Sequence, residues 1–176
     1  MSITSCETSG GAAINMYLYN SVSAAYNLTL TNCTFKDNVG TGATNSGRGA
    51  IHLFGKNNGA YVNLTMTGCT FDNNDMTSTT VANGGGAITS YYSKMNIDKC
   101  IFKNNDIAGS AADGGVIKAT GNNTTQTITI TNSLFYNNTC KDEGGAIYLN
   151  ATQCIFTMYN CTFVDNATSS STSSDA

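Results

Sequence analysis

The chain has 176 residues, a formal net charge of −3 at pH 7, and only 11% charged residues. This composition excludes the basic stripe that neutralises nucleic-acid phosphates, and no apolar run reaches the roughly 18 residues of a membrane span. Apolar residues nevertheless recur at fixed offsets, so we expect one ordered β domain rather than a disordered chain. We assign residues 1–168 to this domain, as a segment of a larger protein, and residues 169–176 to a Ser/Thr-rich linker or tail.

Two signatures alternate five times along the chain. The first is glycine-rich and reads Gly10-Gly11-Ala12-Ala13, Gly49-Ala50-Ile51, Gly85-Gly86-Ala87-Ile88, Gly114-Gly115-Val116-Ile117 and Gly144-Gly145-Ala146-Ile147. The second is a phenylalanine with an asparagine three places later, at Phe35 and Asn38, Phe71 and Asn74, Phe102 and Asn105, Phe135 and Asn138, and Phe163 and Asn166. A repeating unit of this length cannot bury its apolar face alone, so the repeats predict a stacked solenoid.

An alternating stretch precedes each phenylalanine, the first being Leu28-Thr29-Leu30-Thr31. Alternation of apolar and polar residues predicts a strand. The alternation slips by one residue at Asn32, Gly68, Lys99, Asn132 and Asn160. Each slip predicts a sharp bend, because Asn and Gly tolerate the left-handed conformation. The glycine signature supplies a third short strand, so we expect an all-β parallel β-helix of about five coils with three strands each.

The inward positions of this β-helix are expected to form its core. They are Leu28, Leu30, Cys33, Phe35, Cys69, Phe71, Cys100, Phe102, Phe135, Cys161 and Phe163. Four of the seven cysteines share one offset, where Ser133 stands in the remaining repeat, which argues against an obligatory disulfide framework there. Cys140 and Cys154 fall in one coil, and their pairing stays open. No C-x-x-C motif indicates zinc.

The repeated asparagines Asn38, Asn74, Asn105, Asn138 and Asn166 predict a ladder of side-chain amides at one corner. The alternative is a calcium site, since Asp37, Asp72, Asp75, Asp106 and Asp165 lie nearby in the sequence. Their spacing matches neither the EF-hand nor the glycine-rich nonapeptide repeat. We therefore expect no metal and no cofactor.

Outward positions of the first strand form the candidate binding face. They are Thr29, Thr31, Thr65, Thr67, Asn96, Asp98, Thr129 and Thr131. Threonine suits an exposed strand in any case. Regular threonine pairs also suit ice binding, although Asp98 and Tyr159 interrupt the array, and Asn96 with Asp98 suits a polar sugar contact. The segments 39–48, 76–84, 107–113 and 139–143 vary in length and are expected to add variable loops at one corner.

Catalytic groups are sparse. Some β-helices cleave pectin-like polysaccharides with clustered acids, or with calcium and a basic residue. The single histidine, His52, lies close to the single arginine, Arg48, and alternation places His52 on the outer surface. The acid pairs Asp72/Asp75 and Asp142/Glu143 fall in turns without a repeated basic partner. We predict no catalytic residue and a protein that is not an enzyme.

Nine Asn-x-Ser/Thr sites are in mild excess over composition, which is consistent with a glycoprotein. They lie at Asn27, Asn32, Asn63, Asn122, Asn123, Asn137, Asn150, Asn160 and Asn166. The sequence has no basic stripe for nucleic acid and no membrane span. The candidate partners are therefore a cell-surface receptor, a glycan, a neighbouring fibre subunit or ice.

The two signatures resemble the repeats of chlamydial polymorphic outer-membrane proteins and of adhesin-like surface proteins from methanogenic archaea. The likeness runs from about residue 10 to residue 166 and is carried by the alternating strand 127–135 and by Gly144-Gly145-Ala146-Ile147-Tyr148. It implies a right-handed, pectin-lyase-like β-helix that is extracellular or displayed on a cell surface and used in adhesion. The translocating barrel of the chlamydial proteins has no counterpart here. Adhesion is therefore the expected function, with ice binding and polysaccharide cleavage as alternatives.

Overall fold

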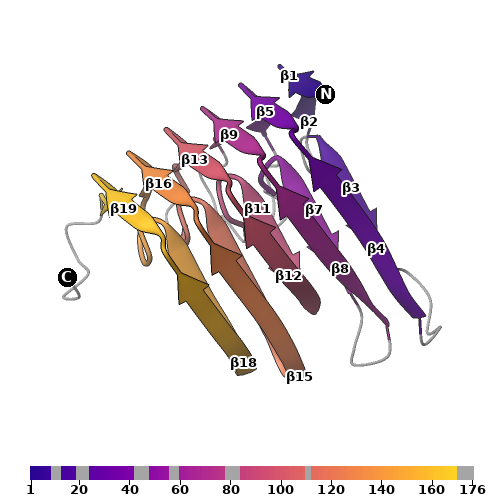
Figure 1. The fold of residues 1–176 in the computed structure, drawn as a ribbon. Coiled ribbons are helices and arrows are strands. Elements are labelled where there is room, and N and C mark those ends of the chain that lie inside the picture. The colour runs from indigo at the N-terminus through magenta and orange to yellow at the C-terminus, as the bar shows by residue number, and fades with distance from the viewer. Residues whose placement is uncertain are drawn as a thin grey trace.

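The computed structural model describes residues 1–8, 13–18, 24–41, 48–55, 60–77, 84–109 and 112–169, with the side chains of 7–8 and 122–124 excepted. Within these ranges the chain is an all-β, right-handed parallel solenoid without a helix, which confirms the predicted fold. Figure 1 shows equivalent strands side by side, with β1 to β4 at one end and β18 and β19 at the other. Residues 10–12 of the first glycine signature and 170–176 of the expected tail lie outside the described residues.

Three parallel sheets form the walls of the solenoid. Sheet A contains β1 (Ser2–Thr4), β5 (Thr34–Lys36), β9 (Thr70–Asp72), β13 (Ile101–Lys103), β16 (Leu134–Tyr136) and β19 (Thr162–Val164). Sheet B contains β2 (Glu7–Thr8), β6 (Val39–Gly40), β10 (Asp75–Met76), β14 (Asp106–Ile107), β17 (Thr139–Cys140) and β20 (Ala167–Thr168). These strands are short because each coil bends again after two or three residues.

Sheet C is longer and has two arms. Its first arm contains β3 (Ile14–Tyr17), β7 (Ile51–Phe54) and β11 (Ile88–Tyr91), and its second arm contains β4 (Ala24–Thr31), β8 (Ala60–Thr67) and β12 (Ser93–Asp98). Two long strands, β15 (Ile117–Thr131) and β18 (Ile147–Tyr159), run through both arms. In all three sheets, paired residues stand at the same repeat offset in successive coils, except for a register shift between Gly121 and Thr125 where β15 pairs with β18.

The glycine signature marks a close approach between coils. A Cβ atom added to Gly86 would lie less than 3 Å from the carbonyl oxygen of Gly115, and one added to Gly115 would lie equally close to that of Gly145. Backbone atoms cannot yield as a flexible side chain does, so only glycine fits at Gly86 and Gly115. The glycines of the signature are therefore required by close packing between coils, just before each strand of the first arm of sheet C begins.

The predicted bends between sheets C and A are confirmed. Positive φ angles of 51–65° occur at Asn32, Gly68, Lys99, Asn132 and Asn160, which are the five positions of the phase slip. A second column of left-handed residues, between sheets A and B, was not predicted: Ser5, Asp37, Asn73, Asn104, Asn137 and Asp165. Most of these are Asn or Asp, which tolerate this conformation better than other residues with a Cβ.

The core is a set of side-chain columns that run along the solenoid axis. Phe35, Phe71, Phe102 and Phe135 are fully buried and stack with ring centroids 4.6, 5.1 and 4.9 Å apart. Leu30, Cys33, Cys69 and Cys100 are also buried. Among the predicted core residues, Leu28 and Cys161 are only partly buried, and Phe163 is 42% exposed. Leu28 and Cys161 pack against the core and Phe163 stacks on Phe135, as inward residues should, but none of the three is fully buried because they lie in end coils, which are covered on one side only.

The cysteines are free thiols. Cys140 belongs to a separate small cluster with Met76, Ile107 and Ala112 on sheet B, whereas Cys154 lies on sheet C, so the two do not pair. Burial raises the pKa of the Cys100 thiol to about 12. A thiol with so high a pKa is protonated at neutral pH and is a poor nucleophile, so this column packs as small apolar residues.

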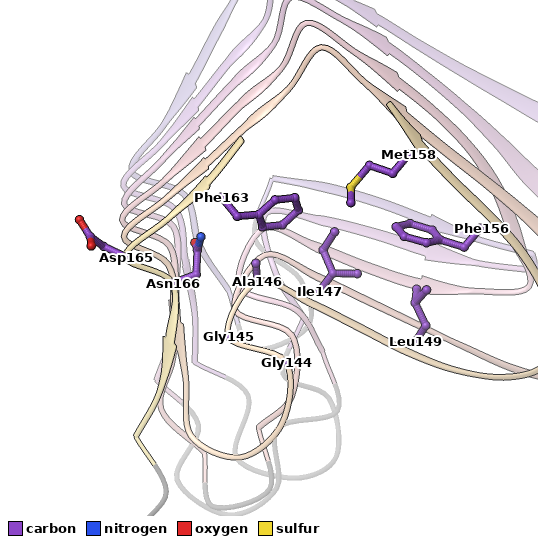
Figure 2. Close-up of a pocket in the computed structure, with 10 residues that line it drawn as sticks. All are labelled: Gly144, Gly145, Ala146, Ile147, Leu149, Phe156, Met158, Phe163, Asp165 and Asn166. Atoms are coloured by element: carbon purple, nitrogen blue, oxygen red, sulfur yellow. The ribbon is translucent and has the colours of Figure 1, made fainter. Parts of the chain in front are cut away.

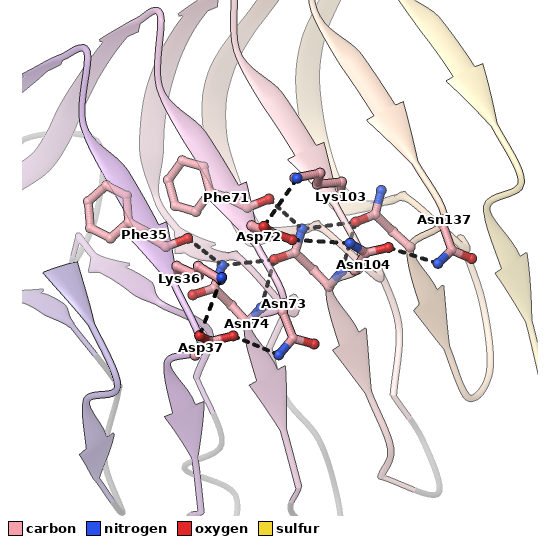
Figure 3. A network of polar contacts seen from close by, with 12 residues as sticks. Phe35, Lys36, Asp37, Phe71, Asp72, Asn73, Asn74, Lys103, Asn104 and Asn137 are labelled. Atoms are coloured by element: carbon pink, nitrogen blue, oxygen red, sulfur yellow. Dashed lines mark hydrogen bonds and ion pairs between the residues drawn. The ribbon is translucent and has the colours of Figure 1, made fainter. Parts of the chain in front are cut away.

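The repeated asparagines form a hydrogen-bonded ladder at the corner between sheets A and B (Figure 3). The Nδ2 group of Asn74 donates to Oδ1 of Asn105 (2.9 Å) and to the carbonyl oxygen of Phe35 (3.1 Å), and the backbone N–H of Asn74 donates to the same Oδ1 (3.1 Å). The pattern repeats from Asn38 to Asn166. Because Asn38, Asn74, Asn105 and Asn138 are fully buried, each amide satisfies backbone groups that water cannot reach.

We expect Phe102→Ala to lower the free energy of unfolding by about 3–5 kcal/mol, because Phe102 is enclosed by two stacked rings and its loss leaves a cavity. Phe163→Ala is the matched control and should cost clearly less, since one side of Phe163 is open. Urea unfolding followed by circular dichroism measures both. Equal losses for the two variants would contradict a core that is closed in the middle and open at the end.

We expect Asn105→Ala to cost about 3 kcal/mol, because the Asn74 N–H and the Phe71 carbonyl lose their bonds to the Asn105 side chain in the interior. Asn138 Oδ1 keeps only the bond from the Asn105 backbone N–H. The control is Asn104→Gly at the neighbouring left-handed position. It loses the hydrogen bond to Asp72 and the exposed one from Asn137 but relieves φ strain, so its net effect should stay within about 0.5 kcal/mol. The same urea titration compares them, and similar losses would show that the ladder is not specifically stabilising.

Candidate functional site

The outer surface of the second arm of sheet C is flat and polar. We call it the threonine–asparagine face and define it by three columns that run along the solenoid axis. The columns are Asn27, Asn63, Lys94 and Thr127; Thr29, Thr65, Asn96, Thr129 and Thr157; and Thr31, Thr67, Asp98, Thr131 and Tyr159. The structure thus places all eight residues of the predicted binding face in two adjacent columns. Thr29, Thr31, Thr65 and Asn96 are exposed, and Thr67, Asp98, Thr129 and Thr131 are half-buried.

A shallow groove crosses the middle of this face. It is lined by Asn27, Asn63, Leu64, Thr65, Lys94, Met95, Asn96, Thr127 and Thr129. Asn63 donates from Nδ2 to Oδ1 of Asn27 at 3.0 Å, and the Lys94 ammonium lies 4.5 Å from the centroid of the Tyr61 ring. The groove therefore combines amides, hydroxyls and one cation held against an aromatic ring. These groups can bind hydroxyl and carboxylate groups of a ligand by hydrogen bonds and charge.

The third column is interrupted by a charge. Asp98 accepts hydrogen bonds at Oδ1 from the Asn132 amide and the Thr131 hydroxyl, both at 2.7 Å. These two bonds, first that from Asn132 and then that from Thr131, hold the pKa of Asp98 below its usual value. Asp98 is therefore ionised at neutral pH, and the Thr131 hydroxyl is oriented toward it. The regular threonine array is thus confined to the middle column.

The first arm of sheet C carries His52, and here the expectation of a solvated surface histidine was wrong. Its side chain is outward, since Ile51 and Leu53 on either side are in the core, yet it is only 3% exposed. The His52 Nδ1–H donates to Oδ1 of Asn15 at 2.8 Å, and the rings of Tyr17 and Phe54 lie 6.4 and 6.1 Å away. Neighbouring coils thus cover an outward residue that alternation alone assigns to the surface.

The environment of His52 disfavours its charged form. Burial, and then the nearby charge of Arg48, lower the pKa of His52 to about 3. A histidine with this pKa is neutral at physiological pH and holds its proton on Nδ1. It is placed to fix the first two coils against each other rather than to exchange protons with a substrate.

The acidic residues do not form the pair Asp72 and Asp75 that the sequence suggested; each contacts other residues instead. Asp72 binds Lys103 at 3.2 Å and accepts from Asn104, while Asp75 lies in register with Asp106 of the next coil. Burial and the Asp106 charge raise the pKa of Asp75, and the Thr139 hydroxyl donates to Asp106. Within the described residues, no three His, Cys, Asp or Glu side chains gather to hold a metal ion.

The acidic residues Asp113, Asp142 and Glu143 contact one another's loops rather than forming a catalytic pair. Asp113 forms an ion pair with the buried Lys118 at 2.8 Å and accepts at Oδ1 from the backbone N–H of Glu143. The backbone N–H of Asp142 donates to the carbonyl oxygen of Ala112. Asp142 and Glu143 therefore help join two consecutive loops. Residues 42–47, 78–83 and 110–111 of the other predicted loops are outside the described ranges.

One protein-family model, described as a right-handed beta helix region, matches residues 43–175. The chain belongs to this right-handed β-helix family. No curated protein and no solved structure matches it. Family membership fits the three parallel sheets and leaves the activity open, because one fold supports many functions. In the part of this β-helix that the structure describes, no helix has the length and apolarity needed to span a membrane.

Sequence reasoning missed the column of Asn27, Asn63, Lys94 and Thr127 and the contact of Lys94 with Tyr61. The signal was present, since the strand alternation continues two residues before Thr29 and its equivalents. The alternating stretch assigned from the sequence begins at Leu28, one residue after this column. Extending the alternation toward the N-terminus would have found the column, whereas the neighbour of Lys94 depends on side-chain packing.

The lowered pKa of His52 predicts a pH dependence of stability. Its folded-state pKa lies below that of the unfolded chain, so the unfolded state binds more protons between about pH 3 and 6.5. The contribution is complete above pH 6.5 and falls as pH drops, with a loss of about 2 kcal/mol between pH 7 and pH 5. Urea unfolding at both pH values should show this difference between the original chain and His52→Gln, which keeps a donor for Asn15 but does not titrate. Identical pH profiles for the two proteins would contradict a buried neutral histidine.

Proposed function

We propose that this chain is a non-enzymatic segment of an extracellular adhesin or surface fibre, and that its threonine–asparagine face binds a glycan. The observation that carries the proposal is the groove on this face, where side chains from successive coils present amides, hydroxyls and the Lys94 ammonium along one line. A ligand with repeated hydroxyl groups matches such a line, because it can make the same contacts in each coil.

Two further observations support this proposal. The Lys94 ammonium is exposed and held near Tyr61, so it provides a fixed positive charge for an acidic sugar. The glycine and Phe-x-x-Asn repeats resemble those of polymorphic outer-membrane proteins and archaeal adhesin-like proteins, which are extracellular. That resemblance also favours display at a cell surface and a receptor or fibre neighbour as a further partner.

Ice binding is the second candidate function. The supporting observation is the middle column, in which Thr29, Thr65, Thr129 and Thr157 are in register and only Asn96 differs. The flanking Lys94 and Asp98 are charged and disfavour an ice-like water layer. Growth of ice crystals in the purified protein separates the two functions: faceted crystals support ice binding, and unshaped crystals leave the glycan proposal.

A polysaccharide lyase or hydrolase is the third candidate, because right-handed β-helices also occur in such enzymes. The feature that favours it is the in-register pair Asp75 and Asp106, in which Asp75 has a raised pKa. Paired carboxyl groups are a common acid–base arrangement. Cleavage of a uronic polysaccharide that is lost in Asp75→Asn would replace the adhesin proposal.

We expect Lys94→Met to weaken the binding of an acidic glycan about tenfold or more, since it removes a charged hydrogen-bond donor from the groove. A glycan array identifies the ligand, and isothermal titration calorimetry then measures the dissociation constant. Lys36→Met is the matched control, because Lys36 is an exposed lysine on sheet A, away from the groove. Unchanged binding by Lys94→Met and by Asn96→Leu would move the glycan site away from this face.

A further inference from the structure

The two arms of sheet C meet at a bend that encloses a narrow part of the interior. Figure 2 shows the interior in the last coil, where Leu149 of the first arm and Phe156 of the second arm point into the space between the arms. In the coil of β11 and β12, the first strand ends at Tyr91 and the second begins at Ser93, so Tyr92 alone joins the arms. Inward side chains on either side of this bend therefore lie near one another.

Serine replaces larger apolar residues on the inner side of this bend. In the preceding coil the two positions are occupied by Leu53 and Val62, which are fully buried in the core. Their partners in the coil of β11 and β12 are Ser90, which pairs with Leu53, and Ser93, which pairs with Val62. Both serines are buried as well. Because serine is smaller and carries a hydroxyl group, the interior at this bend is less filled by side chains and more polar than it is one coil earlier.

The next coil places an amide at the same bend. Its strand β15 supplies Ala119, which pairs with Ser90, and Gln126, which the register of β12 and β15 places opposite Ser93. The Gln126 side chain is 1% exposed, and its Nε2 group donates to the carbonyl oxygen of Thr120 at 2.8 Å. Thr120 directly follows Ala119, so this bond carries the Gln126 amide across the bend to the first arm, beside the coil that holds Ser90.

Two oxygen atoms at this bend lack a protein partner. Within the part of the chain that the structure describes, neither Ser90 Oγ nor Gln126 Oε1 makes a hydrogen bond, although both atoms are buried. The bond from Gln126 Nε2 to Thr120 fixes which end of the amide is the oxygen. Buried polar groups are almost always satisfied, by protein atoms or by ordered water. The hydroxyl of Ser93, which donates to the carbonyl oxygen of Tyr91 at 3.4 Å, can also accept a hydrogen bond.

We propose that this bend is a binding site for an ordered water molecule, held between Ser90 and Gln126 inside the solenoid. The Ser90 hydroxyl donates to the water, and the water donates to Gln126 Oε1 and to Ser93 Oγ. Three hydrogen bonds are typical of a buried water molecule. The site lies in the interior, so it goes beyond the proposed glycan binding and does not depend on it.

The surroundings of the site favour water over an ion. The residues that flank it in the neighbouring strands include Leu53, Val62 and Ala119, none of which carries a charge. An ion among these neutral groups would be buried without compensation, which is costly. A neutral molecule that both donates and accepts matches one hydroxyl donor and two acceptor oxygens.

The sign of the stability change in Ser90→Ala tests the proposal. With the water bound, the variant loses a hydrogen bond, and the equilibrium constant for unfolding should rise about fivefold. Without the water, the same change removes an unpaired buried hydroxyl, and the constant should fall. Urea unfolding followed by circular dichroism measures both variant and original chain.

Ser133→Ala is the matched control, since Ser133 is a buried serine whose partners belong to the protein. Its hydroxyl accepts from the backbone N–H of Cys100 at 3.1 Å and donates to the carbonyl oxygen of Thr131 at 2.7 Å. Ser133→Ala should therefore raise the unfolding constant in the same titration, independently of any water at the bend. A Ser90→Ala protein that is more stable than the original chain, beside a destabilised Ser133→Ala, overturns the inference.

A high-resolution crystal structure locates the water directly. It should show one water oxygen within about 2.7–3.2 Å of both Ser90 Oγ and Gln126 Oε1. Ser90→Val, which places methyl groups where the preceding coil has Leu53, should fold and lose this water. A direct bond between Ser90 and Gln126, or an interior without water at this bend, overturns the inference. Glycan binding should be the same in Ser90→Ala as in the original chain, so the two proposals fail separately.

Discussion

Hydrogen bonding between successive coils stacks the strand residues on their equivalents in the next repeat, and the rest of the structure depends on this register. Because the strands are parallel and in register, each side chain is stacked on a residue of the same offset, about 4.8 Å away along the axis. A column is stable only where its members attract one another or are at least compatible. Phenylalanine stacks on phenylalanine and asparagine amides donate along the ladder. The same residue types recur in the sequence because each column requires compatible side chains at the same offset.

The fold and most of the interior were predictable because the columns repeat. The phase slip located five left-handed bends, including one at Lys99, a residue with no special preference for that conformation. The second column of left-handed residues was missed although the signal was present. The inward Phe and Asn of each repeat are three residues apart, which is itself a one-residue slip, but the residues at the slip vary among Ser, Asp and Asn. Burial was mispredicted in the end coils for a different reason. Phe163 has the same pattern as Phe135, and only the presence of a further coil distinguishes them.

The candidate site was predictable in part. Alternation identifies outward residues, and it placed Thr65 and Asn96 in adjacent coils of one column. It does not reveal what covers an outward residue, which is why His52 was assigned to the surface although Asn15 and two aromatic rings enclose it. It also does not reveal contacts between different columns, such as Lys94 with Tyr61. Those contacts depend on side-chain packing that no single repeat contains.

The register also limits what an outer face of this kind can do. Side chains on neighbouring coils are held parallel and evenly spaced, so they are suited to contact an extended ligand at many points. Most catalytic sites instead require several groups to converge on one atom. On the threonine–asparagine face, such convergence occurs at Asp98, where Thr131 and Asn132 both donate to one carboxylate oxygen. There the donors satisfy a residue of the chain itself, so the remaining amides and hydroxyls stay arranged as a line, which favours recognition of a repeating polymer.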